Sequence, residues 1–248
     1  MREIHAQTAT TYGTLTIVED AESLARVAAD RLVAWATETT EPVRVALSGG
    51  STPRRTYQQL VSPRLLHRVP WPRIHWFWGD ERFVPYDHPD SNFGMVRNAM
   101  LAAAPIPGAN IHPIPTVDVT PDQAVAEYER VLRLAYGADE LDRNRPLFDI
   151  CLLGLGDDGH TASLIPGEPV LHERKRWVAK VAHGRPETRI TLTYPPINSS
   201  RRIVFLVSGI AKRDILRAVH EGGSDTPAAQ LAPFGNLLFI ADRAAAGA

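Results

Sequence analysis

The sequence is poor in cysteine, has almost no net charge and has no long apolar run. Only one of its 248 residues is a cysteine, Cys151, so no disulfide can form within the chain, and its apolar neighbours predict burial. A single buried thiol fits a reducing compartment, and we therefore expect a cytoplasmic protein. The formal net charge of -1 provides no basic excess for binding nucleic acid or a membrane surface.

We expect the chain to contain neither a membrane-spanning helix nor a secretory signal. No apolar run approaches the roughly 18 residues that a transmembrane helix needs, and residues 1–13 are polar and contain no apolar core of a secretory signal. No repeat, low-complexity tract or linker divides the chain. We therefore expect residues 1–248 to form one domain, and nothing in the sequence indicates an obligate protein partner, a nucleic acid or a membrane as its partner.

Segments with the patterns of strands and helices alternate along the chain. Short apolar runs predict strands at residues 15–18, 43–47, 74–78, 148–153, 177–182, 188–193, 203–207 and 237–240. Apolar residues three or four positions apart predict helices at residues 20–37, 122–136 and 210–220, one opening at Pro53 with Thr52 as N-cap, and one after Asp90-Ser91. This alternation is typical of a doubly wound α/β fold, with a mostly parallel sheet and helices on both faces.

The segment Gly154-Leu-Gly-Asp-Asp-Gly-His160 follows one of these strands and precedes a segment that looks helical. It matches the pattern of a dinucleotide-binding turn, but Asp157 and Asp158 would place carboxylates where a pyrophosphate must lie. Histidine exchanges protons near neutral pH, and a neighbouring carboxylate can orient it. We therefore predict His160 as an acid–base catalyst oriented by Asp158, the alternative being a histidine that only caps a turn.

A second glycine-rich turn lies between the strand at 43–47 and the helix at Pro53. It consists of Ser48, Gly49, Gly50, Ser51 and Thr52. Glycines let backbone N–H groups converge on an anion, the following helix N-terminus adds partial positive charge, and hydroxyls add donors. We predict that this turn binds phosphate; a plain tight turn with an N-cap is the alternative. It has no Gly-Lys-Ser/Thr ending, so it is not a nucleotide-hydrolysing loop.

Charged residues follow two more strands. Asp80 and Arg82 come directly after the strand at 74–78, where Arg82 could bind a phosphate, a carboxylate or a developing oxyanion, or pair internally with Asp80 or Glu81. We assign Asp80 and Arg82 to the substrate site.

Lys212 lies in the first turn of the helix at 210–220 and opposes its dipole. An anion must compensate this charge, either Asp214, Glu221 or a sugar phosphate. Arg185 and Arg189, which flank a strand, are further candidates for the same pocket.

Four segments resemble, in order, those of the 6-phosphogluconolactonases, in the group that includes glucosamine-6-phosphate deaminases and ribose-5-phosphate isomerases. They are Leu47-Ser-Gly-Gly-Ser-Thr-Pro53, Gly79-Asp-Glu-Arg82 with Asp90-Ser-Asn92, Gly154-x-Gly-x-Asp-Gly-His-Thr-Ala-Ser-Leu164, and Ser208-Gly-x-x-Lys212. The resemblance implies a Rossmann-like sheet and hydrolysis of 6-phospho-D-glucono-1,5-lactone to 6-phosphogluconate, a step of the oxidative pentose phosphate pathway. It implies no metal and no organic cofactor.

One position separates the lactonases from their deaminase relatives. Deaminases typically carry a glutamate five residues after the histidine, and here that residue is Ile165, which cannot transfer a proton. Lactone hydrolysis needs only a base, here His160, and donors for the oxyanion, which Arg82 or the N–H groups near Gly49 can supply. We therefore favour a lactonase that holds its 6-phosphate with Lys212, Arg82 and the turn at 48–52. A deaminase-like isomerase and a non-catalytic sugar-phosphate sensor remain the alternatives.

Overall fold

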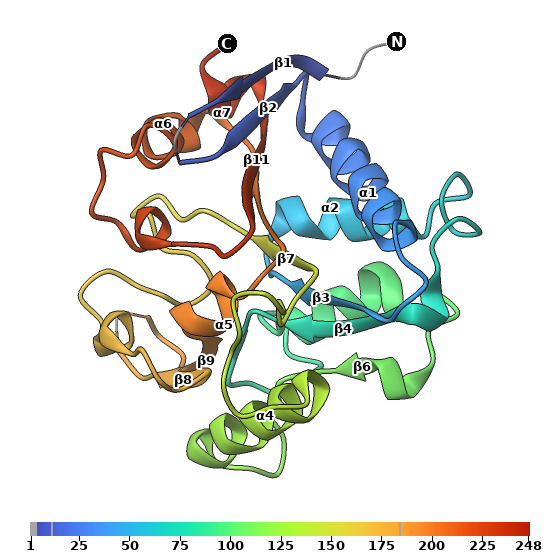
Figure 1. Ribbon diagram of the computed structural model, residues 1–248, viewed down its shortest axis with the longest axis vertical. Helices are drawn as coiled ribbons and strands as arrows, with labels where there is room; N and C mark the ends of the chain where they lie inside the picture. The colour runs from blue at the N-terminus through green and yellow to red at the C-terminus, as the bar shows by residue number, and fades with distance from the viewer. Residues whose placement is uncertain (1–3, 11, 184) are drawn as a thin grey trace.

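The structure is a computed structural model that describes residues 4–10, 12–183 and 185–248. Its main sheet consists of β1 (Ile4–Ala9), β2 (Thr14–Val18), β3 (Val43–Leu47), β4 (Ile74–Trp78), β6 (Ile111–His112), β7 (Ile150–Leu153), β10 (Arg202–Val207) and β11 (Asn236–Asp242). These strands run in the order β1-β2-β11-β10-β7-β3-β4-β6 (Figure 1). Every neighbouring pair is parallel except β1 with β2, which confirms the mostly parallel sheet.

Helices pack on both sides of this sheet. They are α1 (Ala21–Thr37), α2 (Ser51–Leu60), α3 (Asn92–Val96), α4 (Pro121–Tyr136), α5 (Tyr194–Asn198), α6 (Arg213–His220) and α7 (Arg243–Ala246). In Figure 1, α1 and α2 lie on one side of β3 and β4, and α4 lies on the other. The doubly wound arrangement expected from the sequence is thus confirmed.

Side-chain caps fix the starts of α1 and α3. The Asp20 carboxylate accepts a hydrogen bond from the Ser23 amide at 2.7 Å, and the Ser91 hydroxyl accepts one from the Gly94 amide at 3.0 Å. The prediction for α2 was wrong by two residues: its N-cap is Gly50 rather than Thr52. Gly50 has φ 102°, a backbone conformation that a threonine adopts only with strain, so the glycine fixes where this helix begins.

A second, smaller sheet corrects part of the predicted topology. It contains β5 (Asp80–Arg82), β9 (Arg189–Leu192) and β8 (Val178–Val181) in that order, and both pairings are antiparallel. The strands predicted at 177–182 and 188–193 therefore exist, but they do not join the parallel sheet. Gly79 links the two sheets, since its amide donates to the Leu47 carbonyl and its carbonyl accepts from Leu192, both at 2.8 Å.

The chain order in the main sheet reverses between β3 and β7. From β3 the chain builds outward through β4 to β6, and it then returns to β7 on the opposite side of β3 before continuing to β10 and β11. The loops that leave the carboxyl ends of β3 and β7 therefore diverge from each other. In open α/β sheets, ligands bind in the crevice that forms at such a reversal.

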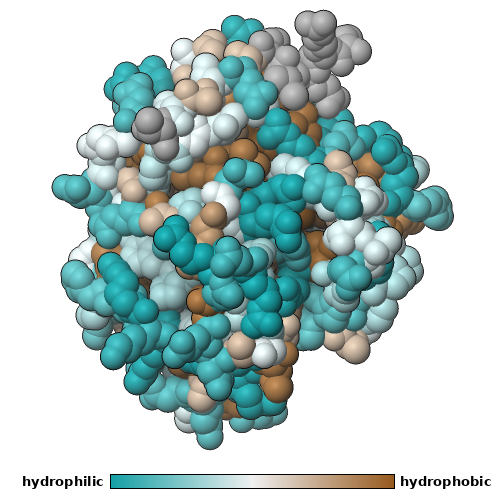
Figure 2. Space-filling model, in the orientation of Figure 1, coloured by the Kyte–Doolittle hydropathy of each residue, from teal (hydrophilic) through white to brown (hydrophobic). Residues whose placement is uncertain are grey.

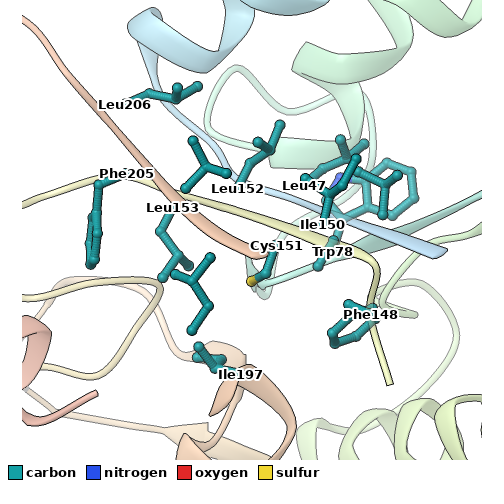
Figure 3. Packing of buried hydrophobic residues seen from close by; sticks show 14 of the residues in the cluster. Leu47, Trp78, Phe148, Ile150, Cys151, Leu152, Leu153, Ile197, Phe205 and Leu206 are labelled. Carbon is teal, nitrogen blue, oxygen red and sulfur yellow. The ribbon is translucent and has the colours of Figure 1, made fainter. Parts of the chain in front are cut away.

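The centre of the sheet is apolar on both faces. All four residues of β7 are buried, including Cys151, as predicted, and Leu47, Trp78 and Phe205 pack around this strand (Figure 3). A parallel strand covered on both sides requires such a continuous apolar run. Figure 2 shows that hydrophilic residues cover most of the visible outer face. The core thus provides a rigid support for the loops at the carboxyl ends of the strands.

Two histidines at the edge of the main sheet should make the fold sensitive to acid. His75 Nδ1 lies 3.1 Å from His112 Nε2, and burial lowers the pKa of both imidazoles, that of His112 to about 4. The nearby His75 and Arg44 charges act in the same direction on His112 and His75 respectively. An unfolded histidine takes up a proton near pH ~6.5, whereas the folded pair resists protonation, so stability should fall as the pH drops from 6.5 towards 4.

Between pH 6.5 and 4, we expect the free energy of unfolding of His112→Phe to fall by about 1–2 kcal/mol less than that of the wild type. This figure is reduced because the ring is partly exposed. The free energy of unfolding, measured for both proteins across this pH range, tests the prediction. An equal loss of stability in both proteins would contradict it.

Candidate functional site

A cavity of about 260 Å³ lies at the carboxyl ends of β3, β4, β7 and β10, where the chain order reverses. The loops after these four strands supply most of its wall, and β9 adds one residue. Its lining comprises Ser48, Gly49, Gly50, Ser51, Thr52, Pro53, Asp80, Arg82, Asn92, Gly154, Leu155, Gly156, His160, Ala162, Arg189, Leu206, Val207, Ser208 and Lys212. Every residue that the sequence assigned to substrate binding therefore lies on one cavity.

A buried tyrosine fixes the first residue of the turn at Ser48–Thr52. The Tyr57 hydroxyl accepts a hydrogen bond from the Ser48 amide at 2.9 Å and donates one to the Ser48 carbonyl at 2.8 Å. The Tyr128 hydroxyl does the same for Trp78, at 2.7 and 2.8 Å, at the end of β4. Both tyrosines are fully buried, so the two strand ends that carry the cavity are rigidly placed.

Asp80 is buried at the cavity wall and is held by two neutral donors. Its carboxylate accepts from the Ser163 hydroxyl at 2.6 Å and from Asn92 Nδ2 at 3.3 Å, and the same Nδ2 donates to the Asp80 carbonyl at 2.9 Å. Asn92 also lies against Gly49: a Cβ atom on that glycine would lie 1.9 Å from Asn92 Oδ1. Asn92 therefore joins the β4 and β3 loops into one wall.

Glu81, the neighbour of Asp80, clamps the start of α3. Its carboxylate accepts hydrogen bonds from the amides of Arg82, Asn92 and Phe93 at 2.7–2.8 Å and from the Ser91 hydroxyl at 3.2 Å. Burial raises the pKa of Glu81 to about 7, and the three amide donors oppose this shift. The clamp fixes the position of Asn92 in the cavity wall.

The glycine-rich turn after β7 brings His160 and Asp158 together. His160 Nδ1 lies 2.5 Å from Asp158 Oδ1, and Arg185 Nη2 donates to Asp158 Oδ2 at 2.7 Å. Burial disfavours the Asp158 charge, but the hydrogen bonds from Arg185 and His160 outweigh it and hold the pKa of Asp158 well below its usual range. Asp158 itself is not part of the cavity lining and contacts it through the histidine ring.

This turn is too tight for a side chain at Gly156. The Gly156 amide donates to the His160 carbonyl at 2.8 Å, and a Cβ atom on Gly156 would lie 2.0 Å from His160 Nδ1. The segment after His160, which looked helical in the sequence, forms turns instead. The Thr161–Leu164 bridge and Pro166-Gly167 end any helical continuation there.

Two arginines lie opposite each other on neighbouring strands of the small sheet. Arg82 in β5 pairs in register with Arg189 in β9, and both line the cavity. Arg82 Nη1 donates to the Asp90 carbonyl at 2.6 Å, rather than to the Asp80 or Glu81 carboxylate that was the alternative to substrate binding. The Nε atoms of both arginines are buried, and neither has a hydrogen-bond partner within the described ranges 4–10, 12–183 and 185–248. Like charges opposite each other on a sheet are destabilising, which favours an anion between them.

Lys212, which also lines the cavity, has a carboxylate partner. Its Nζ atom lies 2.5 Å from Asp157 Oδ1, in the glycine-rich turn. The sequence suggested Asp214 or Glu221 as the compensating anion, but Asp214 contacts Arg213 and Arg217 instead, at 3.3 and 3.7 Å. Asp157 lies 55 positions away along the chain, so spacing along the helix could not reveal it.

Two further observations bear on ligands and membranes. The part of the chain that the structure describes contains no group of three or more histidine, cysteine, aspartate or glutamate side chains arranged to hold a metal ion. Among the described residues, no helix is both long and apolar enough to cross a bilayer.

Known proteins resemble this chain over most of its length. A 6-phosphogluconolactonase from Synechocystis is 43% identical over 204 residues, which cover 81% of this chain and 82% of the relative. The human 6-phosphogluconolactonase is 33% identical over 231 residues, covering 90% and 87%. The solved structure of 6-phosphogluconolactonase from Trypanosoma cruzi matches with a TM-score of 0.81 and 27% identity, covering 98% of each chain.

The fold extends to a protein of different activity. A monomeric glucosamine-6-phosphate deaminase matches with a TM-score of 0.80 at 22% identity, covering 94% of this chain and 98% of that one, and it shares the fold alone. The family model for glucosamine-6-phosphate isomerases and 6-phosphogluconolactonase matches residues 19–239. With a match of this extent and relatives above 30% identity, the chain belongs to the glucosamine-6-phosphate isomerase/6-phosphogluconolactonase family.

Proposed function

We propose that this protein is an enzyme that hydrolyses 6-phospho-D-glucono-1,5-lactone to 6-phosphogluconate in the pentose phosphate pathway. The observation that carries the proposal is one cavity that holds His160, paired with Asp158, together with Lys212, Arg82 and Arg189. Hydrolysis of a phosphorylated lactone requires an acid–base group for the ester bond and cations that bind the phosphate. The names of the relatives support the same activity.

His160 acts as the general base in this proposal. The Asp158 carboxylate lies 2.5 Å from Nδ1, closer than the Arg185 Nη2 donor at 3.2 Å. We therefore assign the ring proton to Nδ1 and the lone pair to Nε2. Nε2 takes a proton from water as the water oxygen attacks the lactone carbonyl carbon, forming a tetrahedral oxyanion. When the bond between that carbon and the ring oxygen breaks, the imidazolium returns the proton to the ring oxygen. The products are a carboxylic acid, which ionises, and a free hydroxyl.

The cations and the turn at Ser48–Thr52 hold the substrate phosphate and stabilise the charge that develops on the carbonyl oxygen. Lys212, Arg189 and the N-terminus of α2 bind the 6-phosphate, which supplies the acceptor that the buried Arg189 Nε lacks within the described residues. Arg82 or the amides near Gly49 stabilise the oxyanion, where one well-placed donor is worth about 10²–10³-fold in rate. Asp80 binds a sugar hydroxyl.

The position that distinguishes deaminases supports hydrolysis over isomerisation. Ile165 is only 3% exposed and belongs to the hydrophobic core. An alkyl side chain there offers no group for ring opening or for moving a proton between carbons. The chemistry therefore stops at hydrolysis.

The direct test is hydrolysis of 6-phosphogluconolactone generated freshly by glucose-6-phosphate dehydrogenase. We expect the protein to accelerate hydrolysis far above the spontaneous rate. Folded protein that binds 6-phosphogluconate without accelerating hydrolysis would instead identify a sugar-phosphate sensor. Release of ammonia from glucosamine 6-phosphate would identify a deaminase.

The proposal extends to organisation and location. We propose that residues 1–248 work as one domain, since the loops that form the cavity come from strands between residues 43 and 207. We also propose a cytoplasmic location, which the single buried thiol of Cys151 supports. Cell fractionation tests the location.

A further inference from the structure

The ammonium group proposed to bind the substrate phosphate already has an anionic partner within the protein. Lys212 Nζ and Asp157 Oδ1 are 2.5 Å apart, which is a close ion pair. Lys212 lines the cavity, whereas Asp157 lies outside the lining. The Lys212 side chain is 26% exposed and the Asp157 side chain is 75% exposed, so the aspartate can turn into solvent while the lysine stays at the cavity.

From this geometry we propose that Asp157 lowers the affinity of the site for phosphate, as a counter-ion that the substrate phosphate displaces from Lys212. This inference rests on the proposed function, because it takes Lys212 as a phosphate ligand. Asp157 touches neither the lactone ring nor the phosphate. It acts through Lys212, and it weakens the binding of substrate and product alike.

The physical basis is competition between two anions for one point charge. The lysine ammonium is a compact cation with three donors, which can serve the Asp157 carboxylate or a phosphate oxygen. If Asp157 leaves, its ion pair is lost when the phosphate binds. If it stays, the carboxylate and the phosphate repel each other across a short distance. Both routes make phosphate binding weaker than it would be without the aspartate charge.

The position of Asp157 also favours release of the product. When the phosphate of 6-phosphogluconate leaves, the neighbouring carboxylate can take its place at Lys212, so the ammonium is never left unpaired at the cavity wall. Since the pair is largely exposed, its effect on affinity should be about two- to fivefold. Because substrate and transition state carry the same phosphate, the effect should appear in KM and leave kcat unchanged.

Asp157→Asn tests the proposal, since asparagine keeps the size of the side chain and removes its charge. We expect the Kd values for inorganic phosphate and for 6-phosphogluconate, measured by calorimetry, to fall about two- to fivefold. Asp214→Asn is the matched control: it removes the same charge two residues from Lys212, but Asp214 contacts Arg213 and Arg217. We expect this control to bind both ligands as the wild type does.

The same substitution in a Lys212→Met protein tests whether Asp157 acts through its contact with Lys212. In Lys212→Met protein, Asp157→Asn should no longer tighten phosphate binding, because the two side chains act as a pair. An unchanged Kd in Asp157→Asn, or an equal gain in Asp214→Asn or in the Lys212→Met background, would overturn the proposal.

The same measurements separate this inference from the proposed function. Tighter phosphate binding by Asp157→Asn in a protein that hydrolyses no lactone would sink the proposed function and leave the counter-ion role standing. Fast lactone hydrolysis with an unchanged phosphate Kd would do the reverse.

Discussion

Replacing His160 with alanine should lower kcat for lactone hydrolysis by about 10²–10⁴-fold, because the change removes the only histidine on the cavity among the described residues. The imidazole is the group that accepts the proton from water, and no other cavity side chain offers a comparable nitrogen. Binding of 6-phosphogluconate should survive, since the cations that hold the phosphate remain. The measurement is initial-rate kinetics corrected for spontaneous hydrolysis, beside calorimetry with the product.

A second variant tests why the histidine works. Asp158→Asn places an amide opposite His160 Nδ1. An amide N–H that donates to Nδ1 would move the ring proton to Nε2, and Nε2 would then have no lone pair with which to accept a proton from water. We expect a loss of activity of about a hundredfold or more, by the same tautomer argument that applies to catalytic His–Asp pairs generally. Asp158→Asn also removes the charge that Arg185 contacts at 2.7 Å, so Arg185 is left with a weaker acceptor.

His67→Ala serves as the control, because His67 is exposed and lies outside the cavity. It should keep full activity. Wild-type turnover by His160→Ala would remove His160 from the mechanism. If Asp158→Asn turned over at the wild-type rate and His160→Ala were inactive, His160 would remain the general base and Asp158 would have no part in orienting it.

The fold was largely predictable because its patterns are local. Apolar runs of four to six residues marked the central strands, and polar caps such as Asp20 and Ser91 marked helix starts. The same logic brought the candidate residues together, since the carboxyl ends of parallel strands meet at one edge of a sheet. His160, Lys212, Asp80, Arg82 and the turn at 48–52 share a cavity for this reason.

What the sequence could not reveal depends on contacts between distant segments. The antiparallel sheet of β5, β9 and β8 joins residues about a hundred positions apart along the chain, and nothing in a short strand shows which sheet it enters. The Asp157–Lys212 ion pair and the contact of Tyr128 with Trp78 also join distant segments. The contact of Tyr57 with Ser48 spans only nine positions, but it was hidden for another reason. A buried tyrosine in an amphipathic helix is indistinguishable, in sequence, from one that merely fills the core. Asn92 belongs to one of the four motifs, but nothing in the motif shows that its side chain lies against Gly49.

Because of this contact, Gly49→Ala is also expected to have a large effect on activity. A Cβ atom would lie 1.9 Å from Asn92 Oδ1 and 2.5 Å from its Cγ, far inside normal contact. Asn92 cannot move away, because it is 3% exposed, its Nδ2 is bonded to Asp80, and the Glu81 clamp holds its amide at 2.7 Å. The turn at Ser48–Thr52 must therefore shift. A shift of about 1 Å in a positioning loop can cost 10²-fold, so we expect kcat/KM to fall about a hundredfold, with much of the loss in KM.

Gly154→Ala is the matched control, because a Cβ atom there meets only Ser48 Oγ, at the ordinary distance of 3.7 Å, although Gly154 also lines the cavity. It should stay close to wild type. The cost of Gly49→Ala should also shrink in an Asn92→Ala background, where the clashing amide is gone, whatever Asn92→Ala costs by itself. Thermal unfolding of each variant separates a displaced turn from a protein that fails to fold. Normal kcat/KM and normal phosphate binding by a folded Gly49→Ala protein would show that the turn does not hold the phosphate.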